Sequence, residues 1–190
     1  MPGPALVVVF GPGGVGKGTV VARLLQLRPE FVLSRSWTTR PPRAGERADA
    51  YVFVDRATFL ERVDADGFLE WTEFPGTGHL YGTPTLDDHG SPVSEDGTDA
   101  VILEIDLDGA RQVKQRHPES VLILIAVASP EIQEARLRAR GDDEEGIARR
   151  LAVGAEEMRI GLTLADYVVE NDEVERCALE VAGIIDARLG

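Results

Sequence analysis

A glycine-rich segment between an apolar run and an amphipathic stretch is the feature that most constrains how this chain folds. The apolar run, residues 5–10 (ALVVVF), is rich in β-branched residues and typical of a strand buried on both faces of a parallel sheet. Residues 11–19 (GPGGVGKGT) follow it directly, and a helical pattern continues to Leu27. Glycines allow backbone N–H groups to surround an anion, and a helix start adds positive charge. The segment therefore predicts a loop that binds nucleotide phosphates, with Lys17 on the outer ones.

Gly18 departs from the usual phosphate-loop pattern, in which a serine or threonine follows the lysine and binds Mg²⁺. Thr19 comes one position later, as in a variant found in some nucleoside monophosphate kinases. We therefore expect Thr19 to hold the ion either directly or through water. The alternative is a glycine-rich turn with a surface lysine. Lys17 and Lys114 are the only two lysines in the chain, which favours a functional position for Lys17.

Apolar runs of strand length alternate with amphipathic stretches of helix length, which predicts an α/β fold with a parallel core sheet flanked by helices. Further strands are expected at residues 101–105, 121–126 and 167–169, and helices at residues 19–27, 108–117, 130–139, 145–159 and 174–189. Residues 34–83 break the alternation, with short strands at 51–54 and 68–74, a helix after Asp55 and a hairpin at 75–78. This stretch predicts an insertion with a mixed or antiparallel sheet, and an acidic loop is expected at residues 87–99.

Charge and composition exclude several classes of protein. Thirty-three acidic residues against 20 basic ones give a net charge of −13, which repels phosphate backbones and argues against nucleic-acid binding. An anionic ligand must therefore be held by a local basic cluster. Cys177 is the only cysteine, which excludes an internal disulfide, and we expect it to pack as a small apolar residue in a helix. No apolar run reaches bilayer length and no secretory pattern begins the chain, so we expect a cytoplasmic protein without membrane contact.

The segment at residues 36–46 (SWTTRPPRAGE) has the chemistry of a phosphate-binding site. Its prolines favour an extended loop in which Arg40 and Arg43 present two planar guanidinium groups to one phosphate. Hydroxyl groups of Ser36 and Tyr51 are further candidate donors. The alternative is a surface ion pair between these arginines and a neighbour such as Glu46.

The glycine loop and this arginine segment together closely resemble the guanylate kinase family. Further matches follow in the family's order: residues 68–71 (FLEW), 81–83 (YGT), 103–106 (LEID), 136–141 (RLRARG) and 169–172 (VEND). The resemblance covers roughly residues 5–188. It implies a P-loop nucleoside monophosphate kinase fold in one domain, residues 1–190. Within it we expect a core at 1–33, 98–130 and 151–190, a GMP-binding insertion at 34–97 and a helical lid at 131–150.

The resemblance also implies an activity, the ATP-dependent phosphorylation of GMP and dGMP (EC 2.7.4.8), and a set of site residues. The GMP-binding residues would be Ser36, Arg40, Arg43, Tyr51, Glu70, Tyr81, Thr83, Glu104 and Asp106. The ATP-binding residues would be Gly11, Pro12, Gly13, Gly14, Val15, Gly16, Lys17, Gly18, Thr19, Arg136 and Asn171. The catalytic residues would be Lys17, Arg43, Arg136, Arg140 and Arg150. Thr19 and Asp106 would hold Mg²⁺, directly or through water.

The chemistry of guanine agrees with these assignments. Its ring N–H and exocyclic amine form a donor pair that one carboxylate, Glu70, accepts, and its carbonyl oxygen needs a donor such as Thr83. Adenine reverses this pattern and would leave buried polar groups unpaired, at about 1–3 kcal/mol each. The alternatives are a solvated strand carboxylate for Glu70, ordinary packed aromatics for Tyr51 and Tyr81, and a helix cap for Asp106.

The implied reaction needs no catalytic base. A nucleoside monophosphate has a second pKa of about 6, so its attacking oxygen is already ionised at neutral pH. Catalysis then consists of alignment and of neutralising charge between two polyanions. We expect Arg138 to face outward, away from Arg136 and Arg140. The expected partners are ATP and GMP, with the chain as a monomer or small homo-oligomer.

Several features depart from the family's pattern besides Gly18. The interval from Glu46 to Tyr51 is one residue shorter than in the family, and the hairpin between Glu70 and Tyr81 is about two residues longer. A stretch broken by proline and glycine replaces the family's helix after Thr83. Two other functions stay open at this point. A ribose bisphosphate phosphokinase would not need Glu70 to read a base. A non-catalytic binding module would lose the glycine loop and its lysine, both of which this chain keeps.

Overall fold

The computed structural model describes all residues except 1–3, 44–45, 47–49, 75–76 and 87–98. In chain order the elements are β1 (Ala5–Phe10), α1 (Lys17–Leu27), β2 (Phe31–Leu33), β3 (Trp37–Thr38), β4 (Val52–Phe53), α2 (Arg56–Asp64), β5 (Phe68–Glu73), β6 (Leu80–Pro84), β7 (Ala100–Glu104), α3 (Leu107–Arg116), β8 (Val121–Ala126), α4 (Pro130–Ala139), α5 (Glu144–Leu164), β9 (Tyr167–Glu170) and α6 (Val174–Leu189). The expected acidic loop, apart from Asp99, and the first half of the hairpin turn lie outside the described residues.

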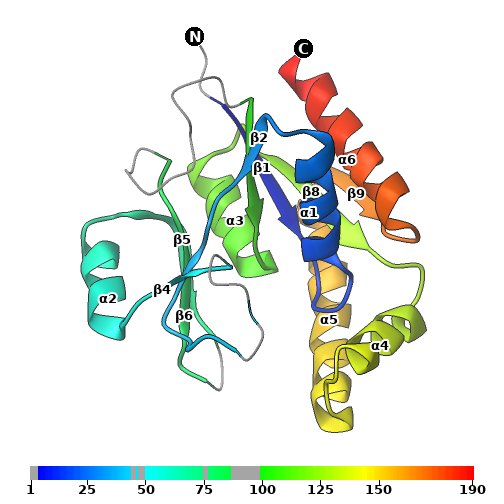
Figure 1. Cartoon of the computed structure of the whole chain (residues 1–190), viewed down its shortest axis with the longest axis horizontal. Helices are drawn as coiled ribbons and strands as arrows, with labels where there is room; N and C mark the ends of the chain where they lie inside the picture. The colour runs from blue at the N-terminus through cyan, green and yellow to red at the C-terminus, as the bar shows by residue number, and fades with distance from the viewer. Residues whose placement is uncertain (1–3, 44–45, 47–49, 75–76, 87–98) are drawn as a thin grey trace.

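A parallel five-stranded sheet forms the core, in the order β2-β7-β1-β8-β9, which confirms the predicted fold class (Figure 1). The apolar run at residues 5–10 is the central strand β1, with β7 and β8 on either side. Because parallel strands end at the same edge, the loop after β1 and the residues after β7 lie close together. That edge is where ligands bind in open α/β sheets.

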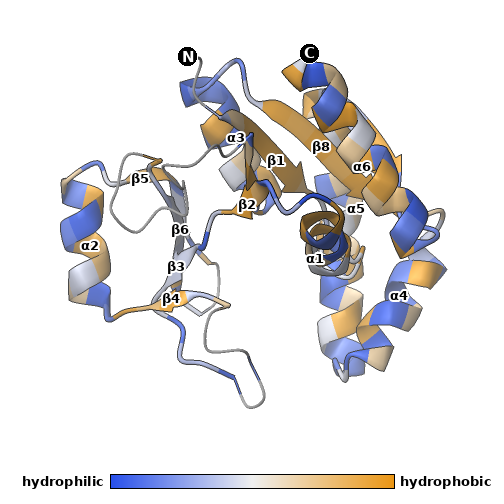
Figure 2. Cartoon of the chain, turned by 45° about the horizontal axis from the view of Figure 1, so that its top comes forward, coloured by the Kyte–Doolittle hydropathy of each residue, from blue (hydrophilic) through white to orange (hydrophobic). Residues whose placement is uncertain are grey.

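Alternating side chains of β1 pack into two separate cores. Val7 and Val9 pack with residues of α1 and α6, whereas Val8 and Phe10 pack with residues of α3 and α5. The strands of this sheet are accordingly hydrophobic along their length (Figure 2). Cys177 is fully buried in α6, as the sequence predicts.

The second sheet, in the order β4-β3-β6-β5, is mixed, which agrees with the expected mixed or antiparallel insertion. Strand β6 pairs antiparallel with β3 and with β5, but β3 and β4 are parallel. Strands β2 and β3 are three and two residues long, too short for a detectable apolar pattern. This sheet and α2 lie to one side of the core, and α4 with the start of α5 lies below it (Figure 1).

Helix α5 is longer than the expected 145–159. It begins after Asp143, whose side chain accepts a 2.6 Å hydrogen bond from the backbone N–H of Gly146. It continues to Leu164 because Ile160 and Leu164 pack against the core beneath the sheet. The expected lid boundary at residue 150 therefore falls inside one continuous helix.

Among the described residues, no helix combines the length and apolar character that crossing a membrane requires.

Candidate active site

The glycine loop encloses a pocket of about 610 Å³ at the start of α1, which we call the loop pocket. Gly14 and Gly16 have φ values of 90° and 91°, in the left-handed region that favours glycine. Helix α1 begins directly after Gly16. The residues lining the pocket are Gly13, Gly14, Gly16, Lys17, Gly18, Thr19, Glu104, Arg136, Arg140, Asn171 and Val174.

The ammonium group of Lys17 lies across the loop. Its Nζ donates to the carbonyl oxygens of Gly11, at 2.7 Å, and Pro12, at 3.2 Å. Burial lowers the pKa of Lys17, and the nearby carboxylate of Glu104 opposes that shift. Burial likewise raises the pKa of Glu104, and the charge of Lys17 opposes it. A Cβ atom placed on Gly18 would lie 3.3 Å from Oε1 of Glu104, so the absent side chain leaves room for this carboxylate.

Two residues from distant elements hold the loop from outside. Arg136 of α4 and Asn171 each donate a 2.8 Å hydrogen bond to the carbonyl oxygen of Val15. Arg136 also donates to the backbone carbonyl of Asn171, at 2.8 Å. The side-chain carbonyl of Asn171 is buried without a hydrogen-bond partner in this structure. Arg136 and Asn171 thus stabilise the backbone of the glycine loop and also line the loop pocket.

Gln133 is a contributor that sequence reasoning missed. It is 7% exposed on α4, and its Nε2 donates a 2.6 Å hydrogen bond to the carbonyl oxygen of Gly13. The available signal was its spacing, because it lies three residues before Arg136 and so on the same helix face.

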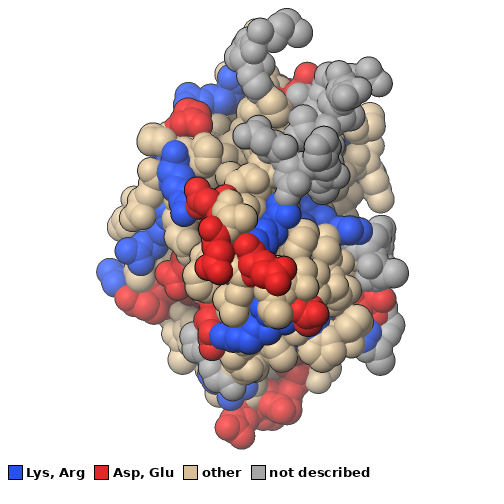
Figure 3. Space-filling view, turned by 90° about the vertical axis from the view of Figure 1, so that its left-hand side faces the viewer, with Lys and Arg blue, Asp and Glu red and all other residues tan. Residues whose placement is uncertain are grey.

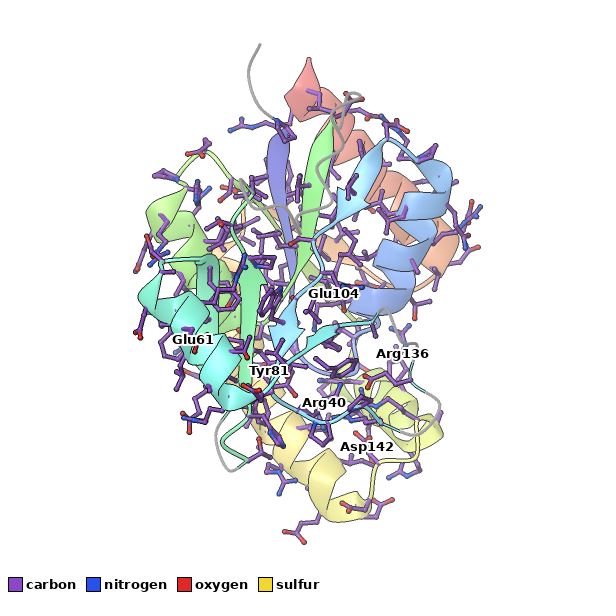
Figure 4. The ribbon with its side chains drawn as sticks, turned by 60° about the vertical axis from the view of Figure 1, so that its left-hand side comes forward. Arg40, Glu61, Tyr81, Glu104, Arg136 and Asp142 are labelled. Carbon is purple, nitrogen blue, oxygen red and sulfur yellow. The ribbon has the colours of Figure 1, made fainter. Side chains whose placement is uncertain are left out.

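A second pocket of about 450 Å³, here called the insertion pocket, lies between the second sheet and the core. Sequence-predicted residues that line it are Lys17, Ser36, Arg40, Arg43, Tyr51, Glu70, Tyr81, Glu104, Asp106, Arg140 and Arg150. The pocket is also lined by residues that were not predicted for the site: Thr72, Phe74, Thr77, His79, Gly82, Ile105 and Arg149. Lys17, Glu104 and Arg140 line both pockets, so the two open onto each other. Figure 4 shows Arg40, Tyr81 and Glu104 around this hollow, with Glu61 on the outer side of α2.

Arg40 is buried and forms an ion pair with Glu46. Both oxygens of Glu46 accept from its guanidinium, at 2.6 and 3.0 Å, and Arg40 is only 8% exposed. Hydrogen bonding to Arg40 lowers the pKa of Glu46 to about 2. The guanidinium also lies over the ring of Tyr51, 5.4 Å from its centroid. The ion pair expected as an alternative exists, but in a pocket wall rather than on the open surface.

Glu70 and Thr83 form a buried pair. They face each other in the register of β5 and β6, and the Thr83 hydroxyl donates a 2.6 Å hydrogen bond to Oε1 of Glu70. Burial raises the pKa of Glu70 to about 7, against the effect of this hydrogen bond. Thr83 has no exposed surface and its hydroxyl is directed to Glu70. Thr83 is thus a partner of Glu70 and does not itself line the insertion pocket.

The two expected Mg²⁺ ligands line different pockets: Thr19 the loop pocket and Asp106 the insertion pocket. One oxygen of Asp106 caps α3 by accepting a 2.8 Å hydrogen bond from the N–H of Gly109, as the alternative reading held. Among the described residues, no three acidic, histidine or cysteine side chains gather into a metal-binding group.

The remaining arginines come from α4, α5 and the turn between them. Arg140 and Arg150 both pair with Asp142, through Oδ2 at 2.6 and 3.1 Å. Arg138 faces outward, as predicted, and pairs with Glu134 and Glu144. On the face shown in Figure 3, basic side chains likewise lie beside acidic ones.

Comparisons with known proteins agree with one another. The family model described as guanylate kinase matches residues 4–188. A guanylate kinase of Prochlorococcus marinus is 44% identical over 182 residues, covering 95% of this chain and 96% of that protein. One from Synechococcus is 45% identical over 178 residues, covering 92% and 90%. The crystal structure of guanylate kinase from Anaplasma phagocytophilum superposes with a TM-score of 0.75 at 29% identity, covering 98% of this chain and 86% of that one.

Proposed function

The chain belongs to the guanylate kinase family, enzymes that phosphorylate GMP with ATP, and we propose that its loop pocket binds ATP and its insertion pocket GMP. The observation that carries this assignment is the set of residues shared by the two pockets. Lys17, Glu104 and Arg140 line both, so a donor phosphate in one and an acceptor phosphate in the other meet at one place. Alignment of this kind supplies much of the catalysis in phosphoryl transfer.

GMP would lie with its phosphate on the arginine side of the insertion pocket and its base on the Glu70 side. Arg40 and Arg43, with the hydroxyl groups of Ser36, Tyr51 and Tyr81, would bind the phosphate. The phosphate then replaces Glu46 as the anion beside Arg40. At the other end, Glu70 would accept the adjacent donors of guanine, with Thr83 acting through Glu70. Asp106 and Glu104 would complete the wall around the base and ribose.

ATP would lie with its phosphates in the glycine loop, residues 11–19, and its adenine beside Asn171. Backbone N–H groups and the start of α1 favour the phosphates. The buried, unpartnered carbonyl of Asn171 is an acceptor suited to an amine. Arg136 holds the loop and Asn171 together and adds positive charge to the same wall.

Charge neutralisation is the chemical task of this chain's own residues. The acceptor phosphate is already ionised, so no residue needs to remove a proton. Lys17 would turn from the Gly11 and Pro12 carbonyls to the outer phosphates, and Arg43, Arg140 and Arg150 would converge on the transferred group. Arg140 and Arg150 must first leave Asp142. Closure of residues 131–150, as a lid, over the insertion at 34–97 would exclude water.

The donor set fits Mg²⁺, because it consists of oxygen atoms. Thr19 would hold the ion together with the ATP phosphates. Asp106 would hold it through water, because one of its carboxylate oxygens already caps α3. When bound, the ion neutralises phosphate charge.

A coupled assay of ADP release tests the assignment with two variants and two controls. Lys17→Ala is expected to abolish activity nearly completely, whereas Lys114→Ala, at the only other lysine, retains it. Glu70→Ala is expected to lose most of its activity with GMP, through a raised KM, while keeping any weak ATP hydrolysis. Glu73→Ala, an exposed carboxylate on the same strand, is its control. Full GMP activity of Glu70→Ala would overturn the base assignment.

The assay also compares substrates. GMP and dGMP are expected to react, and AMP and a ribose bisphosphate are not. Turnover of a ribose bisphosphate that is unaffected by Glu70→Ala would instead support the sugar phosphokinase reading.

A further inference from the structure

Gly109, in the first turn of α3, lies against the carboxylate of Glu70. A Cβ atom placed on Gly109 would lie 2.9 Å from Oε2 of Glu70 and 3.1 Å from its carboxyl carbon. Both distances are well inside van der Waals contact of carbon with either atom. The position that the Glu70 carboxylate occupies is therefore available only while residue 109 has no side chain.

The backbone at Gly109 gives no reason for glycine. The residue lies within α3 and is not among those with a left-handed φ. Its N–H donates to Oδ1 of Asp106, a bond that any residue except proline can make. Glycine is less favourable than alanine inside a helix because it loses more conformational freedom. The next nearest atom to a Cβ at this position is Cδ1 of Ile105, at 3.2 Å, the end of a flexible side chain. The carboxylate of Glu70 is thus the closest group that requires glycine here.

Helix α3 cannot easily move away from β5. Gln112 exchanges two hydrogen bonds with the backbone of Trp71, at 3.1 and 3.4 Å, directly after Glu70. Arg116 donates a 2.9 Å hydrogen bond to the carbonyl oxygen of Phe68, directly before the Leu69–Glu70 pair. Ala110 and Val113 also anchor the helix in the core. A side chain at residue 109 would therefore displace the flexible carboxylate rather than the helix.

On its other side, the carboxylate is held by Thr83. The 2.6 Å hydrogen bond from Thr83 fixes Oε1, and Glu70 is 5% exposed. Glu70 is thus fixed between a hydroxyl group on β6 and the bare backbone of α3. Any movement away from residue 109 strains or breaks the bond to Thr83.

We propose that Gly109 is a positioning residue for substrate recognition, which keeps the Glu70 carboxylate where a purine with two adjacent N–H donors can bind. This inference rests on the proposed function of Glu70. Gly109 acts only through Glu70 and is not itself a contact of the substrate.

The test is steady-state kinetics of Gly109→Ala in the full chain. The KM for GMP is expected to rise about tenfold or more, because small displacements of a binding group have effects of that size. The KM for ATP should stay within about twofold of its original value. Gly183→Ala is the matched control, since Gly183 also lies in a helix and a Cβ there meets nothing within 4 Å. This control is expected to match the unmodified chain.

A double variant separates positioning from a general structural role. In the background of Glu70→Ala the carboxylate is gone, so Gly109→Ala should have no further effect on the KM for GMP. An equal effect in both backgrounds, or an equal rise in the KM for ATP, overturns the inference. If Gly109→Ala alone fails to fold, folding of the double variant supports the conflict with Glu70, and unfolding of both overturns it.

The single variants also distinguish the inference from the proposed function. If Glu70→Ala raises the KM for GMP and Gly109→Ala leaves it unchanged, the inference fails and the assignment of Glu70 stands. If Glu70→Ala itself leaves the KM for GMP unchanged, the proposed function of Glu70 fails.

Discussion

Asp142 accepts two hydrogen bonds from Arg140, at 2.6 and 3.2 Å. Its carboxylate therefore pairs with the same guanidinium group that we propose to bind the transferred phosphate. Its Oδ2 also lies 3.1 Å from Nε of Arg150. The hydrogen bond from Arg140 lowers the pKa of Asp142, so it remains charged at neutral pH. One aspartate therefore competes with phosphate for two arginines.

Asp142→Asn is expected to lower the KM for ATP up to about fivefold. Ion pairs this exposed contribute about 0–1 kcal/mol, which limits the effect. The change keeps the shape of the side chain and removes the competing charge. Initial rates at varied ATP and saturating GMP measure this KM. Glu134→Gln, which removes a partner of the outward-facing Arg138, is the control. A raised KM would mean that Asp142 positions the arginines instead.

Glu70→Gln is expected to stabilise the unliganded chain increasingly as pH rises. Burial raises the pKa of Glu70 from 4.5 to about 7, so folding favours its protonated form. The contribution of Glu70 to stability is therefore fully present below pH about 4.5 and is lost as pH rises through about 7. At about 1.36 kcal/mol per pKa unit, this loss is on the order of 3 kcal/mol, and glutamine avoids it.

Urea denaturation without nucleotide at pH 5 and pH 8 measures this difference. The free energy of unfolding of Glu70→Gln minus that of the unmodified chain should be larger at pH 8. Glu73→Gln, at an exposed position on the same strand, should show no such change. An equal difference at both pH values would contradict the raised pKa.

Thr83→Val is expected to raise the KM for GMP more strongly at pH 7 than at pH 9. Valine keeps the volume of threonine but removes the hydroxyl that donates to Glu70. Without this donor the pKa of Glu70 rises above about 7, and less of the carboxylate is ionised at neutral pH. Higher pH restores the ionised form that accepts guanine. Thr163→Val, whose hydroxyl donates to Ile160 in its own helix, is the control. If the ratio of the KM for GMP of Thr83→Val to that of the unmodified chain were the same at both pH values, the effect of Thr83 would not act through the ionisation of Glu70.

Arg136→Ala and Arg140→Ala are expected to differ in stability. Arg136 donates to the carbonyl oxygens of Val15 and Asn171, and each such bond contributes about 1–2 kcal/mol. We expect Arg136→Ala to lower Tm by roughly 4–16 °C and to raise the KM for ATP. Arg140 pairs with its neighbour Asp142, so its removal should lower kcat with little change in Tm. Calorimetric scans beside kinetics test this, and an equal fall in both Tm values would contradict it.

The fold could be predicted to a large extent because its signals are local. The strand before the glycine loop and the helix after Pro130 have the expected bounds at residues 5–10 and 130–139. The insertion was predicted less well, because β3 and β4 are two residues long and their parallel pairing depends on contacts across the chain. Gln133 was missed because a lone polar residue on a helix resembles a surface residue until its partner on the loop is known.

The amino-acid sequence by itself determined the α/β architecture, the glycine loop and the residues rich in phosphate-binding chemistry, since periodicity and residue type are properties of short segments. Only the tertiary structure decided which of these groups meet. The register of β5 and β6 directs Thr83 to Glu70, and the packing of α3 on β5 sets Gly109 against the same carboxylate. Such contacts join residues distant in the chain and depend on ångström-scale packing, which a linear pattern does not contain.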